Sequence, residues 1–128
     1  MTAPRTDGRR GLGAAGERLS AHFLERRGYR ILDRNVRLNR GEIDLVATQG
    51  ETLVLVEVRL RRSAGVDAAL ESVSPRKQRR LRLLAAEYCA RLAEQPAAVR
   101  IDVVGIALDR QGRLREIRLI ENAVEGDG

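Results

Sequence analysis

The chain has 128 residues and a formal net charge of +6, and 43% of its residues are hydrophobic, 33% are charged and 2% are aromatic. This length predicts a single domain, and the lone cysteine, Cys89, excludes an intrachain disulfide and a cysteine-rich zinc site. Two tyrosines and one phenylalanine are too few for RNA recognition by base stacking on aromatic platforms. No apolar run approaches the ~20 residues of a membrane-spanning helix, so we expect a cytoplasmic protein without a membrane partner.

The folded domain is expected to cover residues 13–122. Residues 1–12 show no hydrophobic periodicity and are predicted to form a flexible tail, and residues 123–128 are predicted to be frayed.

The first predicted element is a helix over residues 13–27. Ala15, Leu19 and Phe23 recur at four-residue spacing, and Gly28 follows as a stop signal. One amphipathic helix therefore opens the domain.

Three strands follow, at residues 30–38, 43–48 and 52–60, with short turns between them. The third strand is apolar on both faces over residues 53–58, which predicts a central position in its sheet.

A short helical turn then precedes a long helix over residues 75–94, for which Ser74 is the expected N-cap and Pro75 the first residue. Two further strands are expected at residues 99–108 and 114–120. This order of elements predicts an α/β fold with a mixed central sheet flanked by helices.

Acidic side chains face one another on the second and third strands. Glu42 and Asp44 share one face of the second strand, and Glu57 lies on the third. A turn at residues 50–51 sets Asp44 opposite Glu57, whereas a turn at residues 49–50 sets Glu42 opposite Glu57. Either register brings two carboxylates to within ~5 Å, a repulsion that a divalent cation such as Mg²⁺ or Mn²⁺ would neutralise.

The alternative is an ordinary set of surface charges. In that interpretation Glu57 and Arg59 form surface ion pairs with neighbouring strands, and Glu42 and Asp44 are solvated at a turn. The apolar sequence around Glu57 argues against it, because a buried carboxylate requires a partner or a metal.

Six sequence features are spread in order over residues 13–120. They are Glu17, Asn35-Val36-Arg37, Gly41-Glu42-Ile43-Asp44-Leu45, Val56-Glu57-Val58-Arg59-Leu60-Arg61, Pro75-Arg76-Lys77-Gln78 and Arg100-Ile101-Asp102-Val103-Val104. In order and spacing the set resembles the YraN family of bacterial endonuclease-like proteins, which is similar to archaeal Holliday junction resolvases within the PD-(D/E)XK nuclease superfamily. The resemblance implies a restriction-endonuclease-like αβββαβ core.

The resemblance also implies a metal site. Asp44 and Glu57 match the metal-binding acids, Val58 would offer its carbonyl oxygen to the same ion, and Glu17 matches an additional acid on the first helix. The implied activity is hydrolysis of phosphodiester bonds in branched or otherwise structured DNA, with Mg²⁺ or Mn²⁺ as cofactor. Because the related resolvases act on two strands as dimers, the resemblance is compatible with a homodimer.

One position departs from the superfamily pattern, which has lysine where this chain has Arg59. Arginine stays protonated, so Arg59 cannot act as a general base, although it could hold a water or brace a phosphate. Lys77, the only lysine, extends the apolar stripe of the long helix over residues 75–94. We therefore expect it to point toward the sheet and to supply part of the role of the motif lysine. The alternative function is a nucleic-acid-binding module of nuclease fold in which Arg59 has abolished or weakened catalysis.

Basic side chains cluster after the third strand and at the start of the long helix. The residues expected to contact nucleic acid are Arg61, Arg62, Arg76, Lys77, Arg79 and Arg80. Cations in the first turns of a helix oppose its dipole, and phosphate contact without base readout explains them. The alternatives are a solvated helix face and a surface for an acidic protein.

Overall fold

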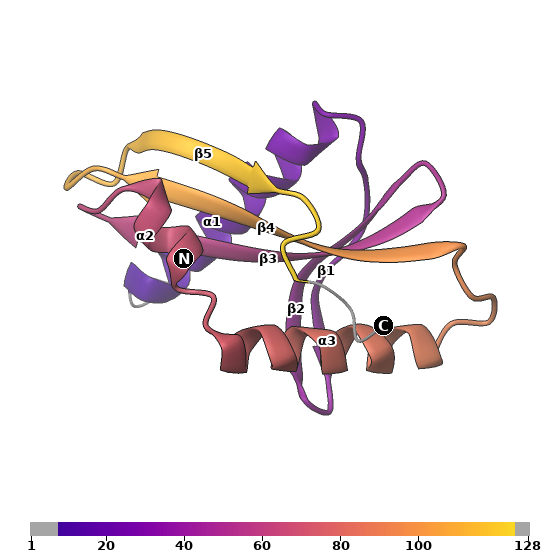
Figure 1. Ribbon diagram of the computed structural model, residues 1–128. Coiled ribbons are helices and arrows are strands. Elements are labelled where there is room, and N and C mark those ends of the chain that lie inside the picture. The colour runs from indigo at the N-terminus through magenta and orange to yellow at the C-terminus, as the bar shows by residue number, and fades with distance from the viewer. Residues whose placement is uncertain (1–7, 125–128) are drawn as a thin grey trace, which may run out of the picture.

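The computed structural model describes residues 8–124, with side chains from residue 13 onward. In chain order its elements are α1 (Gly8–Glu25), β1 (Arg30–Leu38), β2 (Gly41–Gln49), β3 (Thr52–Arg62), α2 (Val66–Glu71), α3 (Pro75–Ala90), β4 (Ala98–Leu108) and β5 (Leu114–Ile120) (Figure 1). None of these helices is long and apolar enough to cross a membrane.

The strands form one mixed sheet in the order β1-β2-β3-β4-β5. Only the β3–β4 pair is parallel among the pairs in residues 8–124, and the other neighbours are antiparallel. The predicted α/β class and the central place of β3 are confirmed, since Val54 and Leu55 are buried on opposite faces of that strand.

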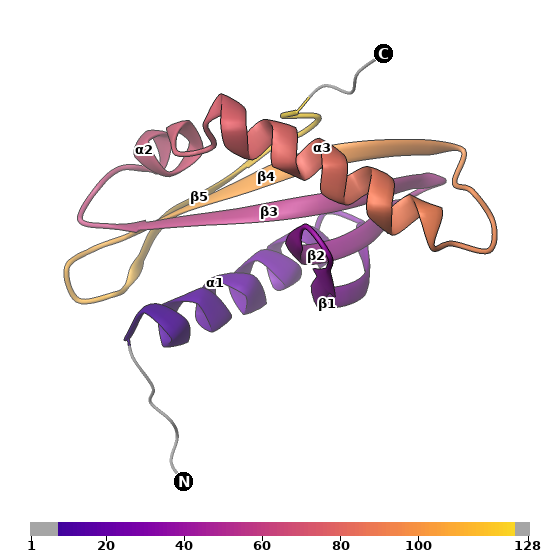
Figure 2. The same cartoon turned by 90° about the horizontal axis from the view of Figure 1, so that it is seen from below.

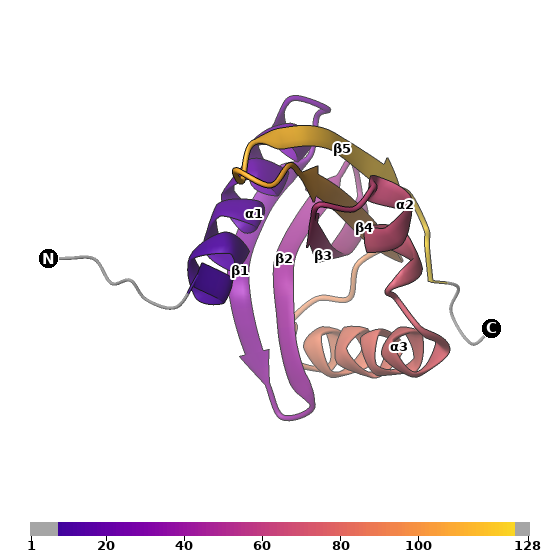
Figure 3. The ribbon, with the colours of Figure 1, turned by 90° about the vertical axis from the view of Figure 1, so that its left-hand side faces the viewer.

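Helices cover both faces of the sheet. α1 lies on one face, and α2 and α3 lie on the other (Figures 2 and 3). Apolar side chains fill both layers: Leu24 and Val56 belong to the core on the α1 side, and Val46, Leu55 and Leu84 belong to the core on the α3 side.

Helix α1 differs from its predicted form in length and in its buried face. It begins at Gly8, so residues 8–12 are helical, and residues 1–7 of the predicted tail lie outside the described part. Leu19 is only partly buried, whereas Ser20 and Leu24 are fully buried. The helix lies close to the sheet because Gly16 faces it, and a Cβ on Gly16 would lie 3.1 Å from a leucine methyl of β3.

Helix α3 begins as predicted and ends earlier. Ser74 caps its N-terminus by accepting a hydrogen bond from the Lys77 N–H at 3.2 Å. The helix stops at Ala90 rather than at residue 94, because its last turn tightens: the Leu92 N–H donates to the Cys89 carbonyl at 3.1 Å, and the Gln95 side chain donates to the same carbonyl at 2.9 Å.

Two residues expected to be frayed are ordered. The Ala123 N–H donates to the Ile101 carbonyl at 2.8 Å, and Val124 is 2% exposed in the core on the α3 side. The end of the domain therefore packs under α3, and residues 125–128 lie outside the described part.

Strands β2 and β3 separate at one end, which we call the fork. Their pairing runs from Gln49 and Thr52 to Leu45 and Val56, so the turn at residues 50–51 is the correct one. Beyond the fork the β1–β2 hairpin diverges from the other strands and extends past α3 (Figure 1). The site described next lies at this fork.

Candidate functional site

Asp44 and Glu57 occupy the fork. Asp44 lies one position beyond the last paired residue of β2, and the register sets it opposite Glu57. Its Oδ2 accepts a hydrogen bond from the Val58 N–H at 2.8 Å. The register with Glu42 opposite Glu57 is wrong, and Glu42 instead pairs with Arg37 at the surface, at 3.4 Å.

Glu57 is a buried carboxylate with two cationic neighbours. Its side chain is 4% exposed, and its Oε2 lies 3.1 Å from Arg59 Nη1 and 3.4 Å from Lys77 Nζ. The interpretation of these acids as ordinary surface charges therefore fails for Glu57, whereas it describes Glu42 correctly.

The electrostatic environment disfavours a charge on Asp44. The pKa of Asp44 is raised to about 7, chiefly by burial, and the Glu57 carboxylate and, more weakly, Glu17 contribute to this rise. The Val58 N–H and Lys77 work against this rise in pKa. A proton or a metal cation would relieve the repulsion between the two carboxylates.

Glu17 reaches the same region from α1. Burial raises the pKa of Glu17, and repulsion from Glu42 adds to the rise, while the Asn35 side chain lowers the pKa by hydrogen bonding to the Glu17 carboxyl. Glu17 also influences the charge on Asp44. The structure thus brings the predicted helix-borne acid near the fork.

Asn35 is a site residue that the sequence reasoning did not assign. It stands on β1 between the pairs Arg34–Leu45 and Val36–Ile43, at the register position opposite Asp44. Its φ of +54° lies in the left-handed region, which asparagine adopts more readily than most residues. No spacing rule identifies such a residue. The one available signal was its place in the segment Asn35-Val36-Arg37, which resembles the YraN family.

Arg59 is fixed between β3 and α2. Its Nε donates to Ser72 Oγ at 2.7 Å, and its Nη1 donates to Glu57 Oε2 at 3.1 Å. Ser72 Oγ in turn donates to the Ala69 carbonyl at the end of α2. Ser72 is a second residue that the sequence reasoning missed.

Lys77 points toward the sheet, as its helical phase predicted. The Ser74 cap fixes the first turn of α3, and the Gln78 side chain donates to the Val73 carbonyl at 3.1 Å. The rigid turn aims the Lys77 ammonium at Glu57. Lys77 and Arg59 therefore approach the same carboxylate oxygen from different elements.

The predicted nucleic-acid contacts do not form one cluster. Arg76, Arg79 and Arg80 line a groove beside α3 together with Arg40 and Leu83. In contrast, the Arg61 guanidinium donates to the Leu60 carbonyl at 2.8 Å, and Arg62 lies beside Gly112 in the turn between β4 and β5.

The carboxylates at the fork suit a hard divalent cation bound partly by water. Within residues 8–124, no group of three or more acidic, histidine or cysteine side chains is arranged to hold a metal by itself. Mg²⁺ is commonly bound through one or two carboxylates, with water and substrate phosphate completing its shell. Asp44 and Glu57 provide that number of carboxylates, and their mutual repulsion favours a cation.

Asp102, whose role the sequence left open, belongs to a separate buried network. It accepts hydrogen bonds from the Tyr29 hydroxyl at 2.8 Å, Arg100 Nε at 2.9 Å and the Asn122 N–H at 2.8 Å. Arg100 also donates to Gln49 Oε1 at 2.8 Å. These contacts tie β4 to its surroundings and make Asp102 structural.

Comparison with known proteins identifies one matching family and several relatives that are similar over most of their length. The model of the "Uncharacterised protein family UPF0102" matches residues 16–106. A UPF0102 protein of Symbiobacterium thermophilum is 50% identical over 114 residues, which cover 89% of this chain and 96% of the relative. Another from Pelotomaculum thermopropionicum is 43% identical over 117 residues, covering 91% and 98%. A third from Anaeromyxobacter dehalogenans is 43% identical over 123 residues, covering 95% and 90%. This chain is therefore a member of the UPF0102 family, in agreement with the YraN-like motifs of its sequence.

Proposed function

We propose that this protein is a metal-dependent nuclease that hydrolyses phosphodiester bonds in branched or otherwise structured DNA. The observation that carries the proposal is the opposed pair Asp44 and Glu57 at the fork, with the pKa of Asp44 raised to about 7. Carboxylates with strongly raised pKa values concentrate at functional sites, because acid–base chemistry and metal binding require pKa values that differ from those of free side chains. The order α1, β1, β2, β3, α2, α3, β4 supports an αβββαβ nuclease core as part of the same proposal, with the short helix α2 as an addition before the second long helix.

The proposed cofactor is Mg²⁺ or Mn²⁺. Asp44 and Glu57 would hold it with the Val58 carbonyl, and Glu17 would contribute from α1. When bound, such an ion lowers the pKa of a water and neutralises charge that develops on the scissile phosphate.

The two cations beside Glu57 would have different roles. Arg59 is fixed by Ser72 and stays protonated, so it would orient Glu57 and brace a phosphate oxygen. Lys77 Nζ, 3.4 Å from Glu57 Oε2, would place an ammonium beside the attacking water. Lys77 thus stands in for part of the lysine that Arg59 replaces.

Cleavage of labelled four-way junction, flap, duplex and single-stranded DNA tests the proposal. The wild-type protein should cut one of the structured substrates in Mg²⁺ or Mn²⁺, and Asp44→Ala should not. Asp67→Ala, which removes an exposed acid on α2, is the matched control and should retain activity. Equal cleavage by the wild-type protein and Asp44→Ala would contradict the proposal.

The role of Lys77 has its own test. Lys77→Ala should lower metal-dependent cleavage by ~10²-fold or more, within the range for one positioned group that stabilises charge in the transition state. Unchanged cleavage would remove Lys77 from the mechanism and leave the metal site standing.

The second candidate is a nucleic-acid-binding module with lost or weakened catalysis. The observation that favours it is the fixation of Arg59 by Ser72 and Glu57, which leaves a permanent cation where the superfamily pattern has lysine. Arg59→Lys distinguishes the two candidates. It should raise cleavage strongly for a module that has lost catalysis, and only modestly for a working nuclease.

A further inference from the structure

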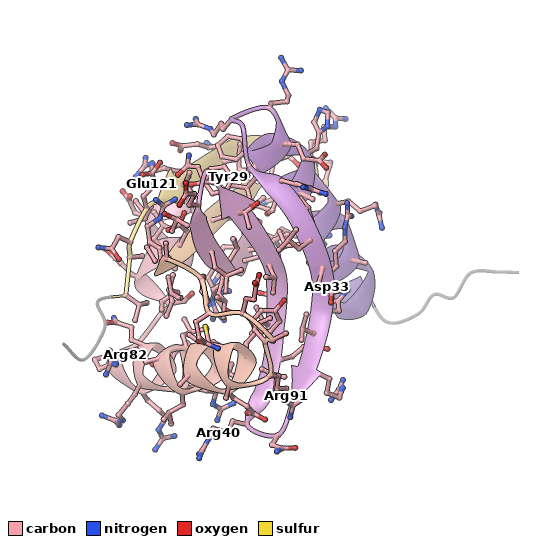
Figure 4. The ribbon with its side chains drawn as sticks, turned by 90° about the vertical axis from the view of Figure 1, so that its right-hand side faces the viewer. Tyr29, Asp33, Arg40, Arg82, Arg91 and Glu121 are labelled. Atoms are coloured by element: carbon pink, nitrogen blue, oxygen red, sulfur yellow. The ribbon has the colours of Figure 1, made fainter. Side chains whose placement is uncertain are left out.

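A groove lies between the turn of the β1–β2 hairpin and α3. Arg40 lines it from the hairpin turn, and Arg76, Arg79, Arg80 and Leu83 line it from α3. Figure 4 shows Arg40 at the end of the hairpin, next to this helix. Four arginines from two separate elements thus face one groove, and Arg40 is the member that no motif indicated.

Hydrogen bonds hold the hairpin turn against the helix. Glu87 on α3 accepts the Asn39 N–H at 2.8 Å and the Arg40 N–H at 3.3 Å. Arg91 approaches the same carboxylate at 2.9 Å and offsets its charge. The position of Arg40 is therefore set by backbone contacts with α3, although its own side chain is exposed.

Side chains from the first turns of α3 point in two directions, toward the fork and toward the groove. Lys77 points to Glu57 at the fork, while its neighbour Arg76 and, one turn later, Arg80 line the groove. The stem of Arg80 passes close to the hairpin turn, since a Cβ on Gly41 would lie 3.8 Å from Arg80 Cδ. The groove is thus separate from the carboxylates and adjacent to them.

The lining of the groove indicates its partner. Four exposed arginines give the groove a positive potential that attracts a polyanion, and arginine suits phosphate because of its forked donors. Among the side chains of residues 13–124, those that line the groove include no aromatic ring on which an unpaired base could stack. We propose that this groove binds the phosphate backbone of double-stranded DNA next to the segment held at the fork. This inference rests on the DNA partner of the proposed function, but not on cleavage.

Salt-dependent binding of a short labelled DNA duplex, measured by fluorescence anisotropy without divalent metal, tests the inference. Arg40→Ala should bind about eightfold more weakly at ~0.1 M salt, and its logarithmic salt slope should be smaller by about 0.9, as expected for one lost phosphate contact. Arg115→Ala is the control, because it removes an exposed arginine from β5 at the opposite edge of the sheet. Equal loss in both variants would overturn the inference.

Glu87→Ala tests the role of the hairpin turn, because two explanations predict opposite changes in DNA affinity. Removal of a negative charge beside the groove should tighten DNA binding if charge alone matters. We expect weaker binding, because the variant releases the turn that positions Arg40. Glu51→Ala, in the exposed turn between β2 and β3, controls for the change in net charge. Tighter binding by Glu87→Ala would overturn the positioning argument.

The remaining outcomes separate this inference from the proposed function. Wild-type binding that Arg40→Ala leaves intact would overturn the groove and spare the nuclease proposal. Tighter binding of single-stranded DNA or of an RNA duplex than of the DNA duplex would overturn the commitment to duplex DNA. Absence of binding to every nucleic acid would overturn both proposals.

Discussion

Two aspartates on the inner strands of this sheet have opposite surroundings. Asp102 is fully buried and accepts hydrogen bonds from Tyr29, Arg100 and Asn122, so its charge is compensated on several sides. Asp44 receives one backbone N–H and faces another carboxylate, and its pKa is raised to about 7. Asp102 stabilises the fold, whereas the charge on Asp44 lowers stability. A carboxylate kept at such a cost is the kind of group that chemistry requires.

The largest expected effect comes from breaking the compensated network. Asp102→Ala leaves Arg100 and Tyr29 without their acceptor in a buried region, and should lower the free energy of unfolding by about 3 to 5 kcal/mol. Urea unfolding measures this loss. A loss below about 1 kcal/mol would show that Asp102 is not structural.

Asp44→Asn should raise the free energy of unfolding, whereas Asp102→Ala lowers it. The pKa of Asp44 rises from 3.8 to about 7 on folding, so the folded state binds more protons between these values and wild-type stability falls as pH increases. Asparagine carries no charge and can still accept the Val58 N–H. The variant should match the wild type below pH 4 and be more stable by up to about 4 kcal/mol at pH 8.

Unfolding curves across this pH range check that result. Asp67→Asn, an exposed acid whose side chain is 76% accessible, should show no comparable gain. If Asp44→Asn destabilises the protein at pH 8, the proposed contrast between the two aspartates fails.

Tyr29→Phe should destabilise the protein less than Asp102→Ala does, because it removes only the hydroxyl from the Asp102 network. The hydroxyl donates to Asp102 and accepts from Arg100 Nη2 at 2.9 Å, while the other donors to Asp102 remain. Loss of both bonds, each to a charged group, should cost about 1.5 to 3 kcal/mol in total, because Asp102 and Arg100 keep their other partners. A loss as large as that of Asp102→Ala would mean that the network depends on this one hydroxyl.

Divalent metal should act on one aspartate only. Mg²⁺ at ten times its dissociation constant should stabilise the wild-type protein by about 1.4 kcal/mol, because the proposed site at the fork forms only in the folded state. Tyr29→Phe should gain the same amount, and Asp44→Asn should gain little. Thermal unfolding with and without Mg²⁺ checks this, and an equal gain in Asp44→Asn would move the metal away from the fork.

The fold was largely predictable because its strongest signals are local. Ser74 and Pro75 marked the start of α3, and the apolar run of residues 53–58 identified the central strand. The predicted stripe of α1 lies at the edge of its buried face, where Leu19 and Phe23 are partly buried against the core, because the helix approaches the sheet along a neighbouring row of residues. The helix packs through small residues such as Gly16 and Ser20, which allow a close approach to the sheet.

The site was predictable only where a residue type carried the signal. Asp44, Glu57 and Lys77 meet as their chemistry and phase indicated. Asn35 and Ser72 could not be predicted, because their roles depend on a left-handed backbone conformation and on where α2 ends relative to β3. Such juxtapositions arise from tertiary packing.

The two-residue turn at residues 50–51 has a consequence for folding kinetics. Asp44 and Glu57 belong to adjacent strands of a local hairpin, so the chain closes only a short loop to bring them together. Asp102 meets Tyr29 across 73 positions of sequence, and its strand docks in parallel after two helices. Contacts of low sequence separation form fastest. Substitutions in the turn should therefore change the folding rate, whereas substitutions at Tyr29 should mainly change the unfolding rate.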